Sequence, residues 1–469
     1  MSNPIKQKIS WLIAVIFTMG VALTSAANGN DSSSNRPNVV LIMADDMGYE
    51  ALSVNGSESC KSPNLDRLAK QGIRFRNCFA NPLCTPSRAK IMTGQYNVRN
   101  YIKFGTLDRG QTTFAHQLKA AGYKTCIAGK WQLGKENDSP QHFGFEQSFL
   151  WQHTRGGRSQ LNGKTIDRRF VNPLLELNGQ EKDYTSGEYG PQLCTNFICD
   201  FIDKNKQDPF LVYYPMILTH CPFDPTPDSS DWDPKRLGST TYKGDKKDPQ
   251  RHFRDMVSFA DKMVGQIISQ LEKSGVRENT LLIFTGDNGT DKPIVTPWNG
   301  TKVVGGKSTM TDMGTRVPLI IDWPAGLKNK GSVVDDLVEF VDMLPTVCEA
   351  TGATVPEQYP GDGSSLMPIL RGNEVQRKKD WIYIWYRGQV MVRNKKYSLV
   401  SKLDGSKPKF TRYKGPFDGT QLENSQLSQE ELGVKAKFEQ IRKRMAKERL
   451  STASAKGKKI AAKQKPGSK

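Results

Sequence analysis

The chain contains few cysteines for its length, eight among 469 residues. This scarcity excludes a small fold held together by many disulfides, although one or two bridges remain open. Cys194 and Cys199 lie close together, but no second pair follows at the spacing of a zinc site. A structural zinc is therefore not expected.

The sequence also lacks a convincing membrane-spanning segment. Its one long apolar run, residues 9–22, is shorter than the roughly 20 residues that a spanning helix needs, and no second candidate follows. Lys6 and Lys8 precede the run and small residues at 24–27 follow it, as in a secretory signal peptide. We expect residues 1–26 to be a cleaved signal, the mature chain to have no transmembrane segment and the protein to be secreted or periplasmic. An uncleaved anchor is the alternative.

Basic residues exceed acidic ones by 19, yet the excess is concentrated at the C-terminal end. After residue 434, thirteen Lys or Arg residues stand against two Glu residues. Residues 451–469 are of low complexity and predict a disordered basic tail. A charge excess placed there gives no reason to expect a nucleic-acid partner. Weak, salt-sensitive attraction to acidic polysaccharide or envelope lipid is the functional alternative to a solvated tail.

The pattern from residue 37 onward predicts an α/β fold, with a large mixed central sheet sandwiched by helices over residues 37–372. Apolar runs too continuous for a half-exposed sheet alternate with segments of helical period, so both faces of the sheet should be covered. The expected strands are residues 38–44, 73–79, 123–128, 209–214, 280–285 and 317–323. The expected helices, each followed by a glycine, are residues 63–71, 113–121 and 252–274.

A change of pattern after the Gly-, Ser- and Pro-rich residues 361–372 predicts a smaller C-terminal domain at residues 373–450. A chain of this length also exceeds what one compact core usually holds. Four short segments predict an antiparallel sheet: residues 381–386, 389–393, 397–402 and 409–413. A helix over residues 430–450 should pack on that sheet through its apolar side, formed by Leu432, Phe438, Ile441 and Met445.

Residues 151–189 are rich in Gly, Arg and Asn and show no clear period. The segment is either the rim of an active site or a plain surface excursion. Its guanidinium groups suit the sulfates or carboxylates of a glycan, because their planar forks match such anions. The candidates are Arg155, Arg158, Arg168 and Arg169.

Acidic and amide residues directly follow two of the expected buried strands. Asp45 and Asp46 come after the first strand, and Asp287 and Asn288 follow the strand at 280–285. In open α/β sheets sites form at this edge, and two such strands side by side would bring three carboxylates and an amide together. Three carboxylates need a cation, and oxygen ligands favour a hard ion, Ca²⁺ or Mg²⁺. Taken separately, each pair is more commonly only a turn or a helix cap.

Residues 84–88, Cys-Thr-Pro-Ser-Arg, contain the pattern C-x-P-S-R. Pro86 suits the first turn of a helix, so Cys84 should lie near a helix N-terminus, where exposed N–H groups favour an anion. Arg88, about one turn further on, can return to the same face. An ordinary buried cysteine is the alternative interpretation.

The pattern at Cys84 resembles the signature of the sulfatase family, the formylglycine-dependent, arylsulfatase-like hydrolases of the alkaline phosphatase superfamily. Three further segments resemble sulfatase motifs in the same order along the chain: K-W-x-L-G at 130–134, H-x-P at 220–222, and G-G-K with R-V-P at 305–307 and 316–318. The resemblance covers most of residues 37–372. It implies that a formylglycine-generating or sulfatase-maturing enzyme oxidises Cys84 to formylglycine (3-oxoalanine).

The resemblance also implies roles for the site residues. One hydroxyl of the hydrated aldehyde attacks the sulfur of a sulfate ester, and the second loses its proton and expels inorganic sulfate. Lys130, Lys307 and His220 would bind the sulfate, while Arg88 and the metal hold the aldehyde hydrate. His220 or Lys307 would protonate the departing alcohol. The implied metal ligands are Asp45, Asp46, Asp287, Asn288 and an oxygen of the modified Cys84, with Ca²⁺ expected and Mg²⁺ as the alternative.

Gln132 departs from the family pattern, which commonly has histidine at this position. An amide can hold the formylglycine hydroxyl by hydrogen bonding but cannot take its proton. Losing one positioned general base typically costs on the order of 10²- to 10⁴-fold in rate. Either another group accepts the proton, or turnover suffers.

These observations predict a secreted, metal-dependent sulfuric ester hydrolase that acts on a sulfated carbohydrate. One alternative keeps the fold and metal but hydrolyses phosphate or phosphonate esters. Another is a polyanion-binding protein that has lost turnover through Gln132 and keeps its charged cleft.

Overall fold

The structure is a computed structural model that describes residues 36–151, 154, 159–161, 163–239, 248–373, 377 and 379–449. The expected signal peptide, the basic tail, Arg155 and Arg158 lie outside the described residues. The division into domains at residue 372 stays a prediction.

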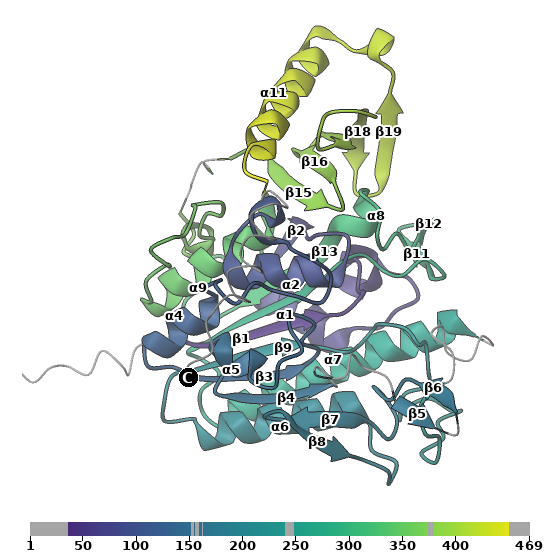
Figure 1. The fold of residues 1–469 in the computed structure, drawn as a ribbon, viewed down its shortest axis with the longest axis vertical. Coiled ribbons are helices and arrows are strands. Elements are labelled where there is room, and N and C mark those ends of the chain that lie inside the picture. Colours follow the sequence, from purple (N-terminus) through teal and green to yellow (C-terminus); the bar gives the residue numbers. More distant parts are fainter. Residues whose placement is uncertain are drawn as a thin grey trace, which may run out of the picture. The chain divides into compact units, whose positions relative to one another are not determined.

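Ten strands form one large mixed sheet, as predicted (Figure 1). Their spatial order is β14 (Val333–Glu339), β2 (Ile73–Phe79), β13 (Arg316–Asp322), β10 (Thr280–Gly286), β1 (Asn38–Ala44), β9 (Phe210–Pro215), β3 (Lys124–Gly129), β4 (Gln147–Trp151), β7 (Leu174–Leu177) and β8 (Gln180–Asp183). The five central strands from β10 to β4 are parallel neighbours. β13 is antiparallel to both of its neighbours, and so is β7.

Helices cover both faces of this sheet. One face packs against α1 (Pro63–Gln71), α6 (Gly190–Lys204) and α7 (Pro249–Lys273). The other packs against α2 (Cys84–Thr93), α4 (Phe114–Ala120), α9 (Met343–Thr351) and α10 (Met367–Leu370). Along β1, Val40 and Ile42 belong to the first core and Val39 and Leu41 to the second, because alternate side chains point to opposite faces. Burial on both sides explains why the strand is apolar at every position.

In the large sheet and its helices, the predicted segments agree with β1, β2 and α1 to the residue, and with β3, β9, β10, β13, α4 and α7 to within three residues at each end. Four strands of the large sheet were not predicted: β4, β7, β8 and β14. β8 is exposed along its whole length, and β14 carries two aspartates, so neither has the continuous apolar run of a buried strand. The segment 151–189 is therefore not a plain loop, because β7 and β8 extend the sheet and β5 (Ser159–Leu161) pairs with β6 (Lys164–Ile166).

The remaining elements are short. They are α3 (Asn97–Asn100), α5 (Ser139–His142), α8 (Asp312–Thr315), the hairpin of β11 (Val295–Trp298) and β12 (Thr301–Val304), and the 3₁₀ helices η2 (Tyr49–Ala51), η3 (Ser53–Asn55), η4 (Phe340–Asp342) and η5 (Asn424–Gln426).

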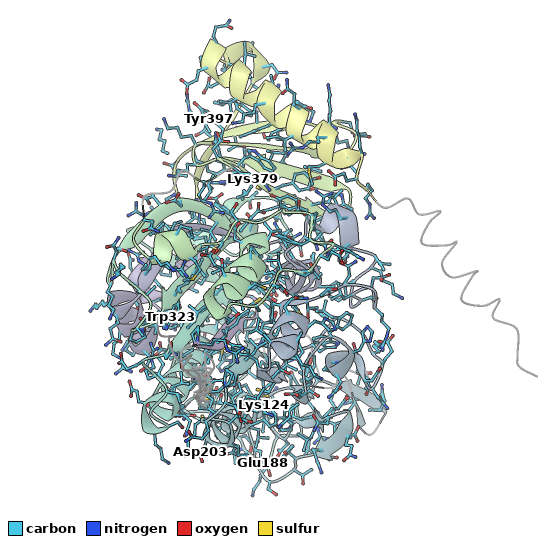
Figure 2. All side chains as sticks on the ribbon, turned by 90° about the vertical axis from the view of Figure 1, so that its left-hand side faces the viewer. Lys124, Glu188, Asp203, Trp323, Lys379 and Tyr397 are labelled. Carbon is cyan, nitrogen blue, oxygen red and sulfur yellow. The ribbon has the colours of Figure 1, made fainter. Side chains whose placement is uncertain are left out.

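The C-terminal part is an antiparallel sheet with a terminal helix, as predicted, but it has a fifth strand, β19, that was not predicted. The strands follow one another in the order β15 (Ile382–Tyr386), β16 (Gln389–Arg393), β17 (Tyr397–Lys402), β18 (Lys409–Gly415) and β19 (Asp418–Leu422). Figure 2 shows α11 (Gln429–Ala446) lying along one face of this sheet, which Tyr397 marks. Phe438, Ile441 and Met445 are buried in the contact, but the prediction for Leu432 was wrong: its side chain is 41% exposed. At 3.6 residues per turn it lies about 120–180° around α11 from those three side chains, so it is on the solvent side of the helix.

Two structural findings bear on the cysteines and on membranes. All eight cysteines fall within the described residues and are free thiols, so the open question of one or two disulfides is answered in the negative. No helix among the described residues combines the length and the apolar character needed to cross a bilayer.

Candidate active site

The acidic residues meet at one edge of the large sheet because β1 and β10 are parallel and in register. Ala44 is the partner of Gly286, so the chain leaves both strands side by side. The Asp46 N–H donates to Asp287 Oδ1 at 3.0 Å, and Asn288 Nδ2 donates to Asp46 Oδ1 at 2.8 Å. Asp45, Asp46, Asp287 and Asn288 are all buried. The structure thus brings together the four residues predicted as metal ligands.

Cys84 is the first residue of α2 and faces this cluster. One ligand atom each from Asp45, Cys84 and Asp287 lie within 4.8 Å of one another. Burial raises the pKa of the Cys84 thiol, and the negative charges of Asp45 and Asp287 add to the shift against the opposing effect of Lys130. An unmodified Cys84 therefore stays protonated at neutral pH and is a poor nucleophile.

Three cations surround the carboxylates. Lys130 directly follows β3, and its Nζ donates to Asp45 Oδ2 at 2.6 Å. Lys307 donates to Asp46 Oδ2. Arg88, in the second turn of α2, donates to Asp287 Oδ2 at 3.2 Å and to the Lys130 carbonyl at 2.6 Å. Positive groups from three different elements therefore converge on one buried anionic cluster.

The charge balance of the cluster fits a divalent cation. Burial raises the pKa of Asp46 and of Asp287, and repulsion from Asp45 raises both further. For Asp45 burial also raises the pKa, but the charges of Lys130 and Arg88 help to outweigh it and bring the pKa below its usual range. Three carboxylates are thus held where they cannot all ionise without more positive charge.

Two buried oxygen atoms in the carboxylate cluster also support a bound divalent cation. Asp45 Oδ1 and Asn288 Oδ1 have no hydrogen-bond partner among the described residues. Such atoms accept only, and buried acceptors in native proteins are almost always satisfied. An all-oxygen set of this kind suits Ca²⁺ or Mg²⁺.

His220 lies between two cations. Its Nδ1 is 2.8 Å from Arg169 NH1 and its Nε2 is 3.1 Å from Lys307 Nζ. Burial, followed by the charges of Lys307 and Lys130, lowers the pKa of His220 well below its usual value. The imidazole is therefore neutral and has one accepting nitrogen, so it can accept from Arg169 or from Lys307, but not from both.

Arg169 belongs to the site, although the sequence suggested for it only a contact with glycan. Asp167 holds its guanidinium through two bonds of 2.8 and 2.6 Å, and the Trp151 ring lies 4.1 Å from its central carbon. The pair occurs in the sequence as D-x-R within an aperiodic stretch, which is too common a pattern to single out.

Arg168 does not face the site. It bonds instead to Asp183 and to the carbonyls of Asn172 and Tyr184. The prediction that Arg168 contacts a glycan is not supported by this arrangement, because its donors are already used within the fold.

Gln132 has a left-handed backbone, with φ of 59°, two residues after Lys130. Its Oε1 is buried and has no hydrogen-bond partner among the described residues. The amide is therefore a free polar group in the K-W-x-L-G segment, in the position where the family commonly has histidine.

An apolar rim borders the N-terminus of α2. The Gly105 N–H donates to Thr85 Oγ1 at 3.1 Å, which holds the loop 101–106 against the residue after Cys84. Ile102 and Phe104 on this loop are 39% and 48% exposed. The loop therefore exposes two apolar side chains close in the fold to the start of α2.

The fold and the site together define a class of protein. A mixed sheet covered by helices carries, at the carboxyl ends of four neighbouring strands, a buried carboxylate cluster, a helix-terminal cysteine and a set of cations. Such a site suits hydrolysis of esters of a tetrahedral anion, because negative charge on that group must be balanced as the bond breaks.

Comparison with protein families identifies the particular family. The sulfatase family model matches residues 37–353, and the model for the C-terminal part of N-sulphoglucosamine sulphohydrolase matches residues 304–451. The chain therefore belongs to the sulfatase family and is a sulfuric ester hydrolase.

Curated relatives are about one-third identical over most of the chain. N-acetylgalactosamine-6-sulfatase of Mus musculus is 30% identical over 389 residues, covering 76% of this chain and 70% of the relative. Arylsulfatase A of Homo sapiens is 32% identical over 412 residues, covering 79% and 76%.

Solved structures share the fold. The crystal structure of Ps i-CgsB has a TM-score of 0.73 at 22% identity, covering 92% of this chain and 98% of that one. The same protein in complex with k-i-k-neocarrahexaose gives 0.70 at 24% identity over the same shares. The phosphonate monoester hydrolase of Agrobacterium radiobacter gives 0.64 at 19% identity, covering 88% and 96%. The fold by itself therefore does not distinguish sulfate from phosphonate esters.

Proposed function

We propose that this protein is a secreted sulfatase that removes sulfate from a sulfated carbohydrate, using a formylglycine made from Cys84 and a bound Ca²⁺ or Mg²⁺. The observation that carries the proposal is the position of Cys84 at the start of α2, with Asp45 and Asp287 within 4.8 Å and cations around them. A buried, protonated thiol has little use there, whereas an oxygen nucleophile derived from it would face both a metal and a sulfate.

The protein residues bind and balance charge. Lys130 and Lys307 are placed to neutralise a sulfate group, since their ammonium groups lie in the cluster beside Asp45 and Asp46. Arg88 keeps Asp287 and the segment after β3 together, which fixes the position of Lys130. A metal bound by Asp45, Asp46, Asp287 and Asn288 would supply Lewis-acid charge stabilisation, and the aldehyde hydrate of residue 84 would supply the attacking oxygen.

His220 is our candidate for protonating the departing alcohol. If Arg169 donates to Nδ1, the ring proton resides on Nε2, on the side of Lys307 and Asp46. A neutral imidazole with its proton on that side can donate it to a leaving oxygen. Lys307 then remains the partner of the sulfate.

Two observations support a carbohydrate substrate. The relatives and neighbours include an N-acetylgalactosamine-6-sulfatase and a protein crystallised with a neocarrahexaose. The rim of Ile102 and Phe104 beside α2 gives an apolar surface on which the face of a sugar ring can lie.

The test uses the protein produced with a formylglycine-generating enzyme. Mass spectrometry of the tryptic peptide 77–88 should show aldehyde in place of the Cys84 thiol, and the same preparation should release inorganic sulfate from sulfated saccharides. If the converted protein cleaves aryl sulfates while ignoring every sulfated saccharide offered, the carbohydrate part of the proposal is wrong. If conversion is complete and no sulfate ester is cleaved, the polyanion-binding alternative replaces it.

A second candidate function is the hydrolysis of phosphate or phosphonate esters, because a phosphonate monoester hydrolase shares this fold. Side-by-side assays of 4-nitrophenyl sulfate, 4-nitrophenyl phosphate and a phenyl phosphonate monoester separate the two. A sulfatase should show the highest kcat/KM for the sulfate ester.

Secretion is part of the proposal because of the sequence at residues 1–26. N-terminal sequencing of the protein recovered from the native host should begin within residues 24–30, outside the cytoplasm. Recovery of the intact N-terminus in the membrane fraction would indicate an anchor instead.

A further inference from the structure

The small C-terminal sheet has two faces of different character. Tyr397 and Leu399 of β17 belong to the core beneath α11, whereas Ser398, Val400 and Lys402 alternate to the opposite face. Where β15 and β16 form that opposite face, it packs on the large sheet through apolar side chains such as Ile384 and Met391. Where β17, β18 and β19 form it, the face carries both polar and apolar side chains and lines a cavity of about 540 Å³.

The cavity is closed on its other side by residues 310–313, which include the start of α8. Its volume falls within the roughly 300–1,000 Å³ of small-ligand sites. It is therefore large enough to hold a ligand, and its walls come from elements far apart in the sequence.

The lining is cationic and rich in hydroxyl and amide groups. Lys402, Lys407 and Lys409 contribute three ammonium groups, none of which forms an ion pair with another described residue. Hydroxyl and amide groups come from Ser401, Thr411 and Gln421.

The acidic groups nearby do not cancel this charge. Asp312 is the one carboxylate in the lining, and its oxygens are engaged by Arg316 at 3.1 Å and by Arg393. Asp404 lies outside the lining, where it accepts the Ser406 N–H at 2.8 Å and interacts electrostatically with Lys402, so it offsets part of one lysine's charge. The cavity keeps an excess of positive charge.

We propose that this cavity binds an acidic sugar unit of a sulfated oligosaccharide, as a second saccharide site separate from the ester-cleaving site. Ammonium groups pair with a sulfate or carboxylate, and the hydroxyl and amide groups serve the sugar hydroxyls. This proposal rests on the proposed function in one respect only, namely that the ligand is a sulfated carbohydrate.

The chain itself limits the distance between the two sites. Lys307 lies in the active site and Met310 in the cavity wall, and three consecutive Cα–Cα steps span at most about 11 Å. An oligosaccharide of a few units can therefore reach both, so the cavity would strengthen binding of long substrates but not of short ones.

The experiment measures binding without turnover, in the full chain carrying Cys84→Ala. Isothermal titration calorimetry compares a sulfated disaccharide with a chondroitin 6-sulfate octasaccharide and a neocarrahexaose. The triple variant K402A/K407A/K409A should bind at least one of the two longer saccharides about tenfold or more weakly, because three charge contacts are lost, and should bind the disaccharide as before. Thr411→Trp, which fills the cavity without changing its charge, should weaken the same longer ligand.

A matched control removes three exposed lysines elsewhere, K119A/K443A/K447A. The proposal is overturned if this control weakens the longer saccharides as much as the cavity variant does, or if neither cavity variant affects them. The proposal would also be overturned if a single-stranded DNA oligonucleotide bound as tightly as the longer saccharides and lost as much affinity in the triple lysine variant. That result would indicate a general polyanion-binding patch. Because Cys84→Ala cannot turn over, these results do not depend on whether the matured protein releases sulfate.

Discussion

At the scale of single residues, the site depends on buried charges that satisfy one another. Arg169 is held by Asp167 and Trp151 and in turn contacts His220, so a residue outside every recognised motif fixes the orientation of a candidate catalytic group. Gln132 differs from Arg169 in both respects: it lies inside a recognised motif, and its buried Oε1 has no hydrogen-bond partner among the described residues.

Replacing Arg169 should reduce catalysis through His220. In Arg169→Met the donor to Nδ1 is lost while much of the buried volume remains, and we expect kcat to fall by about 10²-fold, within the range for a mispositioned acid or base. The matched control is Arg168→Met, which removes a guanidinium of the same segment that bonds away from the site. If Arg169→Met raised KM and left kcat unchanged, that result would contradict a positioning role for Arg169.

Gln132→His should raise turnover if the missing base limits the rate. Supplying an imidazole where the amide has a free oxygen should increase kcat at least about tenfold, because general bases contribute 10²- to 10⁴-fold when well placed. Steady-state kinetics on a formylglycine-containing preparation checks it, with Gln132→Asn as the control that cannot titrate. An unchanged kcat would show that another group already accepts the proton.

At the scale of elements, burial decides which side chains of α11 stabilise the C-terminal sheet. Phe438 is 1% exposed and Leu432 is 41% exposed, because the two apolar side chains lie about 120° apart around the helix. The two residues therefore provide a matched pair for the contact between helix and sheet.

Phe438→Ala should lower the free energy of unfolding by about 3–5 kcal/mol, because it leaves a cavity under α11. Leu432→Ala should change it by less than about 0.5 kcal/mol, as is usual for exposed positions. Urea unfolding followed by tryptophan fluorescence measures both. Equal effects would mean that the helix packs on the sheet through another side.

At the scale of the whole molecule, the site lies where four parallel strands of the sheet end together. β10, β1, β9 and β3 are neighbours, and the residues that follow them supply the carboxylates, His220 and Lys130. A cation bound there connects segments more than two hundred residues apart in the sequence, so it should stabilise the native state as a whole.

Removing divalent cations should therefore lower the melting temperature as well as activity. Differential scanning calorimetry with EDTA and then with added Ca²⁺ or Mg²⁺ should show a Tm that rises with ion concentration, since binding at 100 times Kd stabilises by about 2.7 kcal/mol. The double variant D45N/D287N should lose this dependence, because two charged ligands are removed. Its Tm without ions should not exceed that of the parent, because Lys130 and Arg88 lose their buried carboxylate partners. If the Tm changed neither with EDTA nor with added ions, a metal at this cluster would be ruled out.

Much of the fold and of the candidate site could be predicted because the sequence patterns that indicate them are short and local. The strand ends at Asp45 and Asp287 and the helix start at Cys84 appear as short patterns of composition and spacing. β8 and β14 were missed because polar edge strands have no such pattern. Leu432 was misplaced because the helical period, at 3.6 residues per turn, puts it about 120–180° away from Phe438, Ile441 and Met445.

The sequence by itself determined the family, the order of the buried apolar elements and the candidate residues at the strand ends, since apolar period and motif spacing are properties of the chain. Only the tertiary structure decided which charges meet. Asp167 and Arg169 reach His220 through a segment without periodicity, and the lysines of the C-terminal cavity gather through strand pairing. Contacts of this kind depend on how distant segments pack, because electrostatic partners are selected by distance in space and not by distance along the chain.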